Sequence, residues 1–197
     1  MTASATEIVT IVSGLPRSGT SMMMRMIDAG GIKALTDDVR KADEDNPRGY
    51  FEYEPVKRTK EDPSWLEQAG GRVVKMVYRL LYDLPADRHY RVIFMERNLE
   101  EVVASQDVML SRRGRDSGGL SKEKLIGIFQ KQLAEFKDWV ARQPNFEILY
   151  VSYNDTLKNA DATVQRVNQF LGGNLNTAAM RQVIEPDLYR QRAASGD

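Results

Sequence analysis

The sequence lacks several residue types that particular chemistries require. Its 197 residues include no cysteine and a single histidine, His89. The absence of cysteine excludes disulfide bonds and thiolate chemistry, and the single histidine excludes a histidine-rich metal site. Basic and acidic residues number 28 each, so the formal net charge is zero and no overall field attracts nucleic acid or an anionic surface. Any positive patch must therefore be local and serve a particular ligand.

Long apolar runs are also missing. No stretch of about 18 apolar residues is present for a membrane helix, and the first residues lack the basic segment of a secretory signal. We therefore expect a cytoplasmic protein without a membrane or nucleic-acid partner. The length suits one α/β domain and is short for two, so a single domain is expected over residues 1–197.

The most informative stretch joins a buried strand, a glycine-bounded loop and a helix. Residues 7–12 form an apolar run, and residues 20–29 have a helical pattern. Between them, Gly14 and Gly19 have the G-x-x-x-x-G spacing of a phosphate-binding loop, but no lysine follows the second glycine. The amides of such a loop and of the helix N-terminus favour an anion. The sequence therefore predicts a phosphate-type ligand that is not a metal-bound triphosphate.

A second candidate anion-binding element follows another apolar run, at residues 91–95. Arg97 comes directly after this predicted strand, and Ser105 lies on the next predicted helix, about two turns along. Open α/β sheets bind their ligands at the carboxyl ends of the strands. We therefore expect Arg97 to contact an anion.

Together the two elements resemble those of sulfotransferases, which use 3′-phosphoadenosine 5′-phosphosulfate (PAPS) and release 3′-phosphoadenosine 5′-phosphate (PAP). The loop of that family is similar to residues 16–21, Pro-Arg-Ser-Gly-Thr-Ser. Its 3′-phosphate element is similar to Arg97-Asn98 with Ser105, although Leu99 replaces a proline that only predisposes the first helical turn. Tyr153 follows a predicted strand as the family's adenine-side tyrosine does. The resemblance implies PAPS as co-substrate, no metal, and these binding residues: Pro16, Arg17, Ser18, Gly19, Thr20, Ser21, Arg97, Ser105 and Tyr153.

The expected fold class is α/β, a P-loop three-layer sandwich with a mostly parallel central sheet. Its predicted strands are apolar throughout, which is typical of a sheet covered by helices on both faces. A helix beginning at Ser121 carries an apolar stripe that we assign to the core, and the last clear helix ends at Gly172. The strands are expected at residues 7–12, 32–36, 73–77, 91–95 and 146–151.

Two charged segments interrupt this pattern. Residues 37–64 are rich in charge and turn signals and are expected to form an irregular or short-helical flap, either a lid over an acceptor or a solvated loop. Within it, the Asn46-Pro47-x-Gly49 turn looks like one in bacterial sulfotransferase-like proteins. Residues 111–119 form a basic, glycine-rich loop. The family's basic Arg-Lys-Gly element is missing. Five arginines either substitute for it or are ordinary surface charges: Arg112, Arg113, Arg115, Arg190 and Arg192.

The resemblance also implies a catalytic base, and here the sequence departs from the family. A histidine commonly lies two residues after a strand lysine, but Val77 occupies that position after Lys75. His89 is expected at the opposite end of the sheet. A carboxylate is the usual replacement, so Glu52 is our candidate because Tyr50 and Phe51 could shield it from water. Asp37 and Asp38 are the alternatives.

The function implied by the resemblance is transfer of a sulfuryl group from PAPS to a hydroxyl or amine of a small-molecule or carbohydrate acceptor. Arg17 is the candidate catalytic cation, acting through charge because an arginine pKa above about 12 makes it a poor proton donor. Two alternatives stay open at this point. One is a non-catalytic PAP-binding protein, and the other is a P-loop kinase, which the missing loop lysine disfavours.

Overall fold

The computed structural model describes residues 8–37, 39, 42–43, 46, 49–112, 114 and 119–184. Its centre is a four-stranded sheet in the order β2-β1-β3-β4, with every neighbouring pair parallel. The predicted parallel sheet is therefore confirmed. Its strands are β1 (Ile8–Gly14), β2 (Val73–Lys75), β3 (His89–Glu96) and β4 (Phe146–Ser152).

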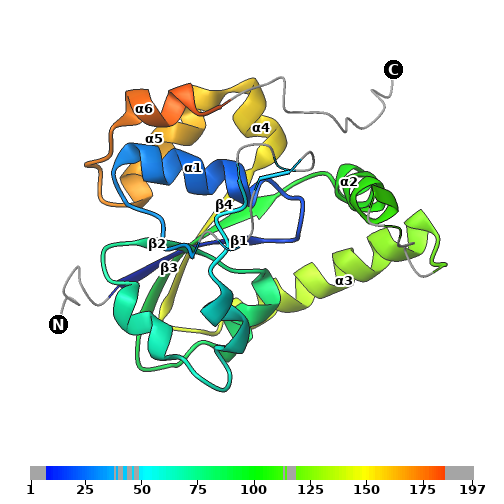
Figure 1. The fold of residues 1–197 in the computed structure, drawn as a ribbon, viewed down its shortest axis with the longest axis horizontal. Helices are drawn as coiled ribbons and strands as arrows, with labels where there is room; N and C mark the ends of the chain where they lie inside the picture. Colours follow the sequence, from blue (N-terminus) through cyan, green and yellow to red (C-terminus); the bar gives the residue numbers. More distant parts are fainter. Residues whose placement is uncertain are drawn as a thin grey trace.

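Helices cover both faces of this sheet (Figure 1). One face carries α1 (Thr20–Gly30), α5 (Ala160–Phe170) and α6 (Thr177–Gln182), and the opposite face carries α3 (Lys122–Val140). The helix α2 (Leu99–Arg112) follows β3 and packs along α3, and the short helix α4 (Tyr153–Lys158) follows β4. The predicted three-layer α/β fold is confirmed. Three 3₁₀ helices complete the described elements: η1 (Glu54–Arg58), η2 (Ser64–Gln68) and η3 (Tyr78–Asp83).

Alternate residues of the central strands supply two separate apolar cores. In β3, Phe94 packs into the core on the α3 side, whereas Ile93 and Met95 pack into the core beneath α1 and α5. Side chains of a strand alternate between faces, so a strand buried on both sides has no polar alternation. Burial on both faces explains the continuous apolar runs. The parallel pairing of β1 with β3 brings the carboxyl ends of these strands together, with Gly14 opposite Met95.

Two sequence-based expectations need correction. The strand expected at residues 32–36 is reduced to a single parallel bridge between Ala34 and Val73. The stripe on α3 was expected to be core throughout, but only Phe136 and Val140 are buried and Ile128 is exposed. The reason is that the N-terminal part of α3 extends past the sheet and packs along α2, which covers only part of its surface (Figure 1).

The flap expected at residues 37–64 is irregular with short helices, as far as the structure describes it. Its described part contains η1, whose Val56 is buried in the core on the α3 side, and it ends where η2 begins, whose Trp65 and Leu66 are buried in the same core. The flap is therefore anchored at its second half. None of the helices in the described ranges combines the length and the apolar character that a membrane span needs.

Candidate functional site

The loop between β1 and α1 has a backbone that requires glycine at two positions. Gly14 and Gly19 have φ angles of 147° and 98°, in the region that favours glycine. A Cβ on Gly14 would lie 2.6 Å from the Met95 carbonyl oxygen, and one on Gly19 would lie 2.4 Å from a ring carbon of Tyr153. Arg17 adopts φ 74° although it is not glycine. The loop is therefore a tight, partly strained turn pressed against neighbouring chain.

The N–H groups at the N-terminus of α1 point toward this loop. The first N–H groups of an α-helix have no partner within the helix, and Gly19, the N-cap of α1, has no side chain to cap them. Such groups form an anion site. The Ser18 N–H instead donates to the Leu15 carbonyl oxygen at 3.2 Å and closes the turn. Ser18 thus faces inward in this structure, and its contact with a ligand stays a prediction, whereas Thr20 and Ser21 lie at the open helix end.

The structure brings the two predicted anion-binding elements into direct contact. Arg17 Nε donates to Ser105 Oγ at 2.9 Å, and Arg97 Nη1 donates to the Arg17 carbonyl oxygen at 3.1 Å. Asn98 caps α2 by accepting the Glu100 N–H at 2.8 Å, which leaves Leu99 as the first helical residue, where the family's proline would stand. Residues eighty positions apart in sequence therefore form one cationic site at the carboxyl edge of the sheet.

Arg97 and Tyr153 pack together beneath the loop. The Arg97 guanidinium carbon lies 4.7 Å from the centre of the Tyr153 ring, a cation–π arrangement. The Arg97 side chain is 8% exposed and pairs with Glu101 Oε2 at 2.8 Å. Burial raises the pKa of the Tyr153 hydroxyl, so this group is neutral at physiological pH. Contact of Tyr153 with a nucleotide base stays a prediction.

The site contains two polar residues, Lys75 and Asn46, that the sequence analysis did not assign to it. Lys75 ends β2, opposite Val12 of β1, and its Nζ donates to the Tyr50 carbonyl oxygen and lies 3.4 Å from Ser21 Oγ. Asn46 donates from Nδ2 to Ser21 Oγ at 2.8 Å. The position of Lys75 at the end of a strand beside the loop was the available signal. The site therefore has a third cation, Lys75, and a flap residue, Asn46, that contacts α1.

The candidate bases lie on the flap side of the site. The Glu52 carbonyl oxygen accepts hydrogen bonds from Thr36 Oγ1 and the Asp37 N–H, so Glu52 lies beside the segment that bridges to β2. Both oxygens of Asp37 accept backbone N–H groups, from Val39 at 3.1 Å and Glu54 at 2.6 Å. Asp37 thus serves the flap backbone. Asp38 lies outside the described residues.

Other predicted residues lie at the edges of the site or beyond the described chain. His89 is exposed at the start of β3, the end opposite the loop, as expected. Arg112 is exposed at the end of α2. Within the described ranges, no three histidine or acidic side chains gather as a metal site would require. The remaining arginines considered for the 3′-phosphate lie outside the described residues: Arg113, Arg115, Arg190 and Arg192.

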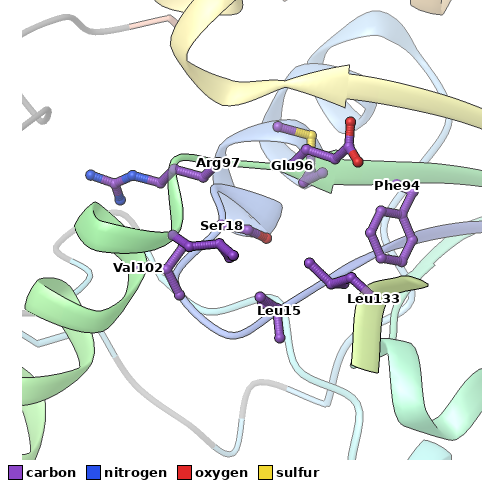
Figure 2. Close-up of a pocket in the computed structure, with 9 residues that line it drawn as sticks. Leu15, Ser18, Phe94, Glu96, Arg97, Val102 and Leu133 are labelled. Carbon is purple, nitrogen blue, oxygen red and sulfur yellow. The ribbon is translucent and has the colours of Figure 1, made fainter. Parts of the chain in front are cut away.

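A small cavity of about 180 Å³ lies behind the loop, between β3, α2 and α3 (Figure 2). It is mostly apolar, and the buried Ser18 hydroxyl points into it, without a hydrogen-bond partner in the described part of the chain. The Arg97 guanidinium points away from it (Figure 2). The cavity therefore lies on the inner side of the cationic site. Its lining residues are Leu15, Ser18, Phe94, Met95, Glu96, Arg97, Leu99, Val102 and Leu133.

Solved structures with the same fold are sulfotransferases. Mouse sulfotransferase SULT7A1 complexed with PAP is 16% identical with a TM-score of 0.55, over 92% of this chain and 62% of the mouse chain. This chain thus spans less than two thirds of that protein. The sulfotransferase domain of the Synechococcus PCC 7002 olefin synthase is 12% identical with a TM-score of 0.52, over 96% of this chain and 90% of that one. A sulfotransferase from Alicyclobacillus acidocaldarius is 16% identical with a TM-score of 0.50, over 91% and 87%.

Comparison of sequences gives the family directly. No curated protein sequence matches this chain. A model of the sulfotransferase domain, in contrast, matches residues 8–186, which is nearly the whole chain and includes both anion-binding elements. The chain belongs to the sulfotransferase domain family, whose general activity is sulfuryl transfer.

Proposed function

We propose that this protein transfers the sulfuryl group of PAPS to a hydroxyl or amine of a small-molecule or carbohydrate acceptor and releases PAP. The observation that carries the proposal is the contact between the two anion-binding elements, in which Arg17 bonds to Ser105 and Arg97 bonds to the Arg17 carbonyl. A ligand with phosphate groups at two ends fits such a paired site. The family match and a fold neighbour crystallised with PAP support this choice of ligand.

In this proposal, different parts of the site hold the two ends of the nucleotide. The N-terminus of α1, with Thr20 and Ser21, would hold the 5′-phosphosulfate through backbone N–H groups and hydroxyls. Arg97 and Ser105 would hold the 3′-phosphate, which gains charge-assisted hydrogen bonds from the guanidinium. Tyr153 supports this arrangement because its ring lies against both Gly19 and Arg97.

The main chemical task is to stabilise charge on the leaving 5′-phosphate. The acceptor attacks sulfur in line with the departing oxygen, and negative charge grows on PAP as the S–O bond breaks, by analogy with phosphoryl transfer. Arg17 and Lys75 would provide fixed positive charge at this point, since both flank the start of α1. Arg17 acts electrostatically because it stays protonated.

The acceptor must also lose a proton, and Glu52 is the proposed base. It lies on the flap next to Tyr50, whose carbonyl accepts from Lys75, so the flap and the cationic site are linked. A base has to reach the acceptor proton within about 3 Å or through one water.

Turnover with a panel of acceptors tests this proposal. The protein is incubated with PAPS and alcohols, phenols, sugars or amines, and PAP release is measured with and without each acceptor. We expect acceptor-dependent PAP release without added metal. PAP binding with no release for any acceptor would instead favour a non-catalytic nucleotide-binding protein. Acceptor-dependent release of ADP from ATP in the presence of Mg²⁺ would favour a kinase.

A further inference from the structure

A buried carboxylate that the proposed mechanism does not use lies beside Arg97. Glu101 is on the first turn of α2, and its side chain is 2% exposed. One of its oxygens accepts a hydrogen bond from Arg97 Nε at 2.8 Å. Asn154 Nδ2 lies 3.1 and 3.2 Å from its two oxygens. Glu101 therefore links the β3–α2 corner to the start of α4.

This pairing differs from the usual arrangement at a helix N-terminus. A glutamate at the third helical position commonly accepts the backbone N–H of the N-cap residue. Here the N-cap is Asn98, and its N–H donates to Asn154 Oδ1 at 3.3 Å instead. The Glu101 carboxylate lies against Arg97 and Asn154. The helix end alone does not account for this geometry.

The result is a guanidinium fixed by contacts from three segments of the chain. Glu101 binds its Nε, the Arg17 carbonyl accepts from Nη1 at 3.1 Å, and the Tyr153 ring covers its face at 4.7 Å. A free arginine side chain has many rotamers, and ordering it on ligand binding costs affinity. A guanidinium that is ordered before the ligand binds avoids that cost. A buried carboxylate is tolerated only where it is paired and hydrogen-bonded, and Glu101 meets both conditions.

We propose that Glu101, itself held by Asn154, is a positioning residue that fixes Arg97 for the nucleotide 3′-phosphate. This inference rests on the proposed function, since it requires Arg97 to bind that phosphate. Glu101 acts through Arg97 and makes no contact with the ligand in the proposal. The proposal extends the 3′-phosphate element, so far Arg97 and Ser105, to Glu101. Glu101 is negatively charged, whereas the Arg97 guanidinium that is expected to bind the phosphate is positively charged.

Two effects of this carboxylate on phosphate binding have opposite signs, and this makes the inference testable. The negative charge of Glu101 repels a nearby phosphate. If this repulsion were the only effect, removing the charge would strengthen PAP binding. The Glu101 carboxylate also orients Arg97 by accepting its hydrogen bond. If this were the only effect, removing the carboxylate would leave Arg97 less ordered and weaken PAP binding. The proposal requires the second effect to dominate.

The variant Glu101→Gln tests the sign because it keeps the side-chain size and removes the charge. Glu100→Gln is the matched control, since Glu100 is an exposed neighbour in the same helical turn and loses the same charge. Binding of PAP and of adenosine 5′-phosphate is measured by calorimetry. We expect Glu101→Gln to weaken PAP about tenfold or more, the scale for a charge-assisted hydrogen bond, and adenosine 5′-phosphate less than about threefold. KM for PAPS should rise by a larger factor than kcat falls, and the control should change neither ligand.

Several outcomes would overturn the proposal. Unchanged or tighter PAP binding by Glu101→Gln means that its charge effect dominates, and equal weakening of both nucleotides means that Glu101 supports the fold rather than the 3′-phosphate element. Asn154→Ala provides a second test should Glu101→Gln fail to fold, with the same selective loss for PAP expected. The double variant should lose no more than Glu101→Gln alone, because both residues act through Arg97.

The failure of this inference can be distinguished from failure of the proposed function. Absence of PAP binding by the wild-type protein would refute the proposed function, and the role of Glu101 with it. Binding by the wild type with no selective loss in either variant would refute only the role of Glu101.

Discussion

Replacement of Arg17 has the most sharply defined consequence in the proposed reaction. Its Nε donates to Ser105 Oγ at 2.9 Å, and it lies on the loop whose helix end faces the leaving phosphate in our proposal. Removal of one preorganised donor from a site of developing charge costs about 10² to 10³ in kcat. We therefore expect Arg17→Ala to lower kcat about 10²-fold or more while the protein stays folded.

The effect on stability can be separated from the effect on kcat with a glycine variant. The φ angle of 74° at Arg17 costs a residue with a Cβ about 1–2 kcal/mol, and alanine keeps that cost. Loss of the bond to Ser105 removes a further ~0.5–1.5 kcal/mol. Arg17→Gly removes the strain at a backbone entropy cost of about 0.5–1 kcal/mol. The glycine variant should therefore equal or exceed the alanine variant in stability by up to about 1.5 kcal/mol.

The assay is PAP release at saturating PAPS and acceptor, together with urea unfolding of each variant. Arg25→Ala is the matched control, because Arg25 lies on α1 and donates to the Val183 carbonyl oxygen at 2.8 Å, away from the loop. It should lose stability and keep kcat. Near-normal kcat in both Arg17 variants, or recovery of kcat in Arg17→Gly, would refute the assignment of Arg17 as the catalytic cation.

The remaining predictions concern the nucleotide, the loop and the base. Ser105→Ala should weaken PAP by about 1.5–3 kcal/mol in calorimetry but leave adenosine 5′-phosphate nearly unchanged, and equal losses would contradict its role at the 3′-phosphate. Gly19→Ala should lower thermal stability and PAP affinity more than Gly31→Ala, because its Cβ would meet a ring carbon at 2.4 Å whereas Gly31 has open space; similar losses would show that the close contact is unimportant. Glu52→Gln should still bind PAPS but lose about 10² to 10⁴ in turnover. Full activity in that variant, with collapse in Asp37→Asn, would make Asp37 the base.

The central strands and the loop could be predicted because local sequence determines them. The apolar run before Gly14 and the glycines at the turn indicate strand, loop and helix without any knowledge of distant contacts. The hydrogen bonds of Arg17 with Ser105 and Arg97 were not predicted. Spacing after a strand places a residue at the carboxyl edge of a sheet but does not specify its hydrogen bonds.

The features that were missed depend on contacts between distant segments. The helix α4 has six residues, too few for a helical period to be recognised. The partial exposure of the α3 stripe follows from where α2 lies. Glu101 and Asn154 are ordinary polar residues in sequence and become a buried pair only when β4 places Asn154 beside the start of α2. Such networks need tertiary structure to be seen.

Calorimetric titration of the wild-type protein with PAP, and separately with ATP and Mg²⁺, tests the central claim most directly. The paired site of Arg17, Arg97 and Ser105 should bind PAP in the absence of metal. Adenosine 5′-phosphate should bind more weakly, since it lacks the 3′-phosphate, and ATP with Mg²⁺ should bind weakest because the loop has no lysine after Gly19. Tighter binding of ATP with Mg²⁺ than of PAP would contradict the claim that this site recognises a 3′-phosphorylated sulfuryl donor.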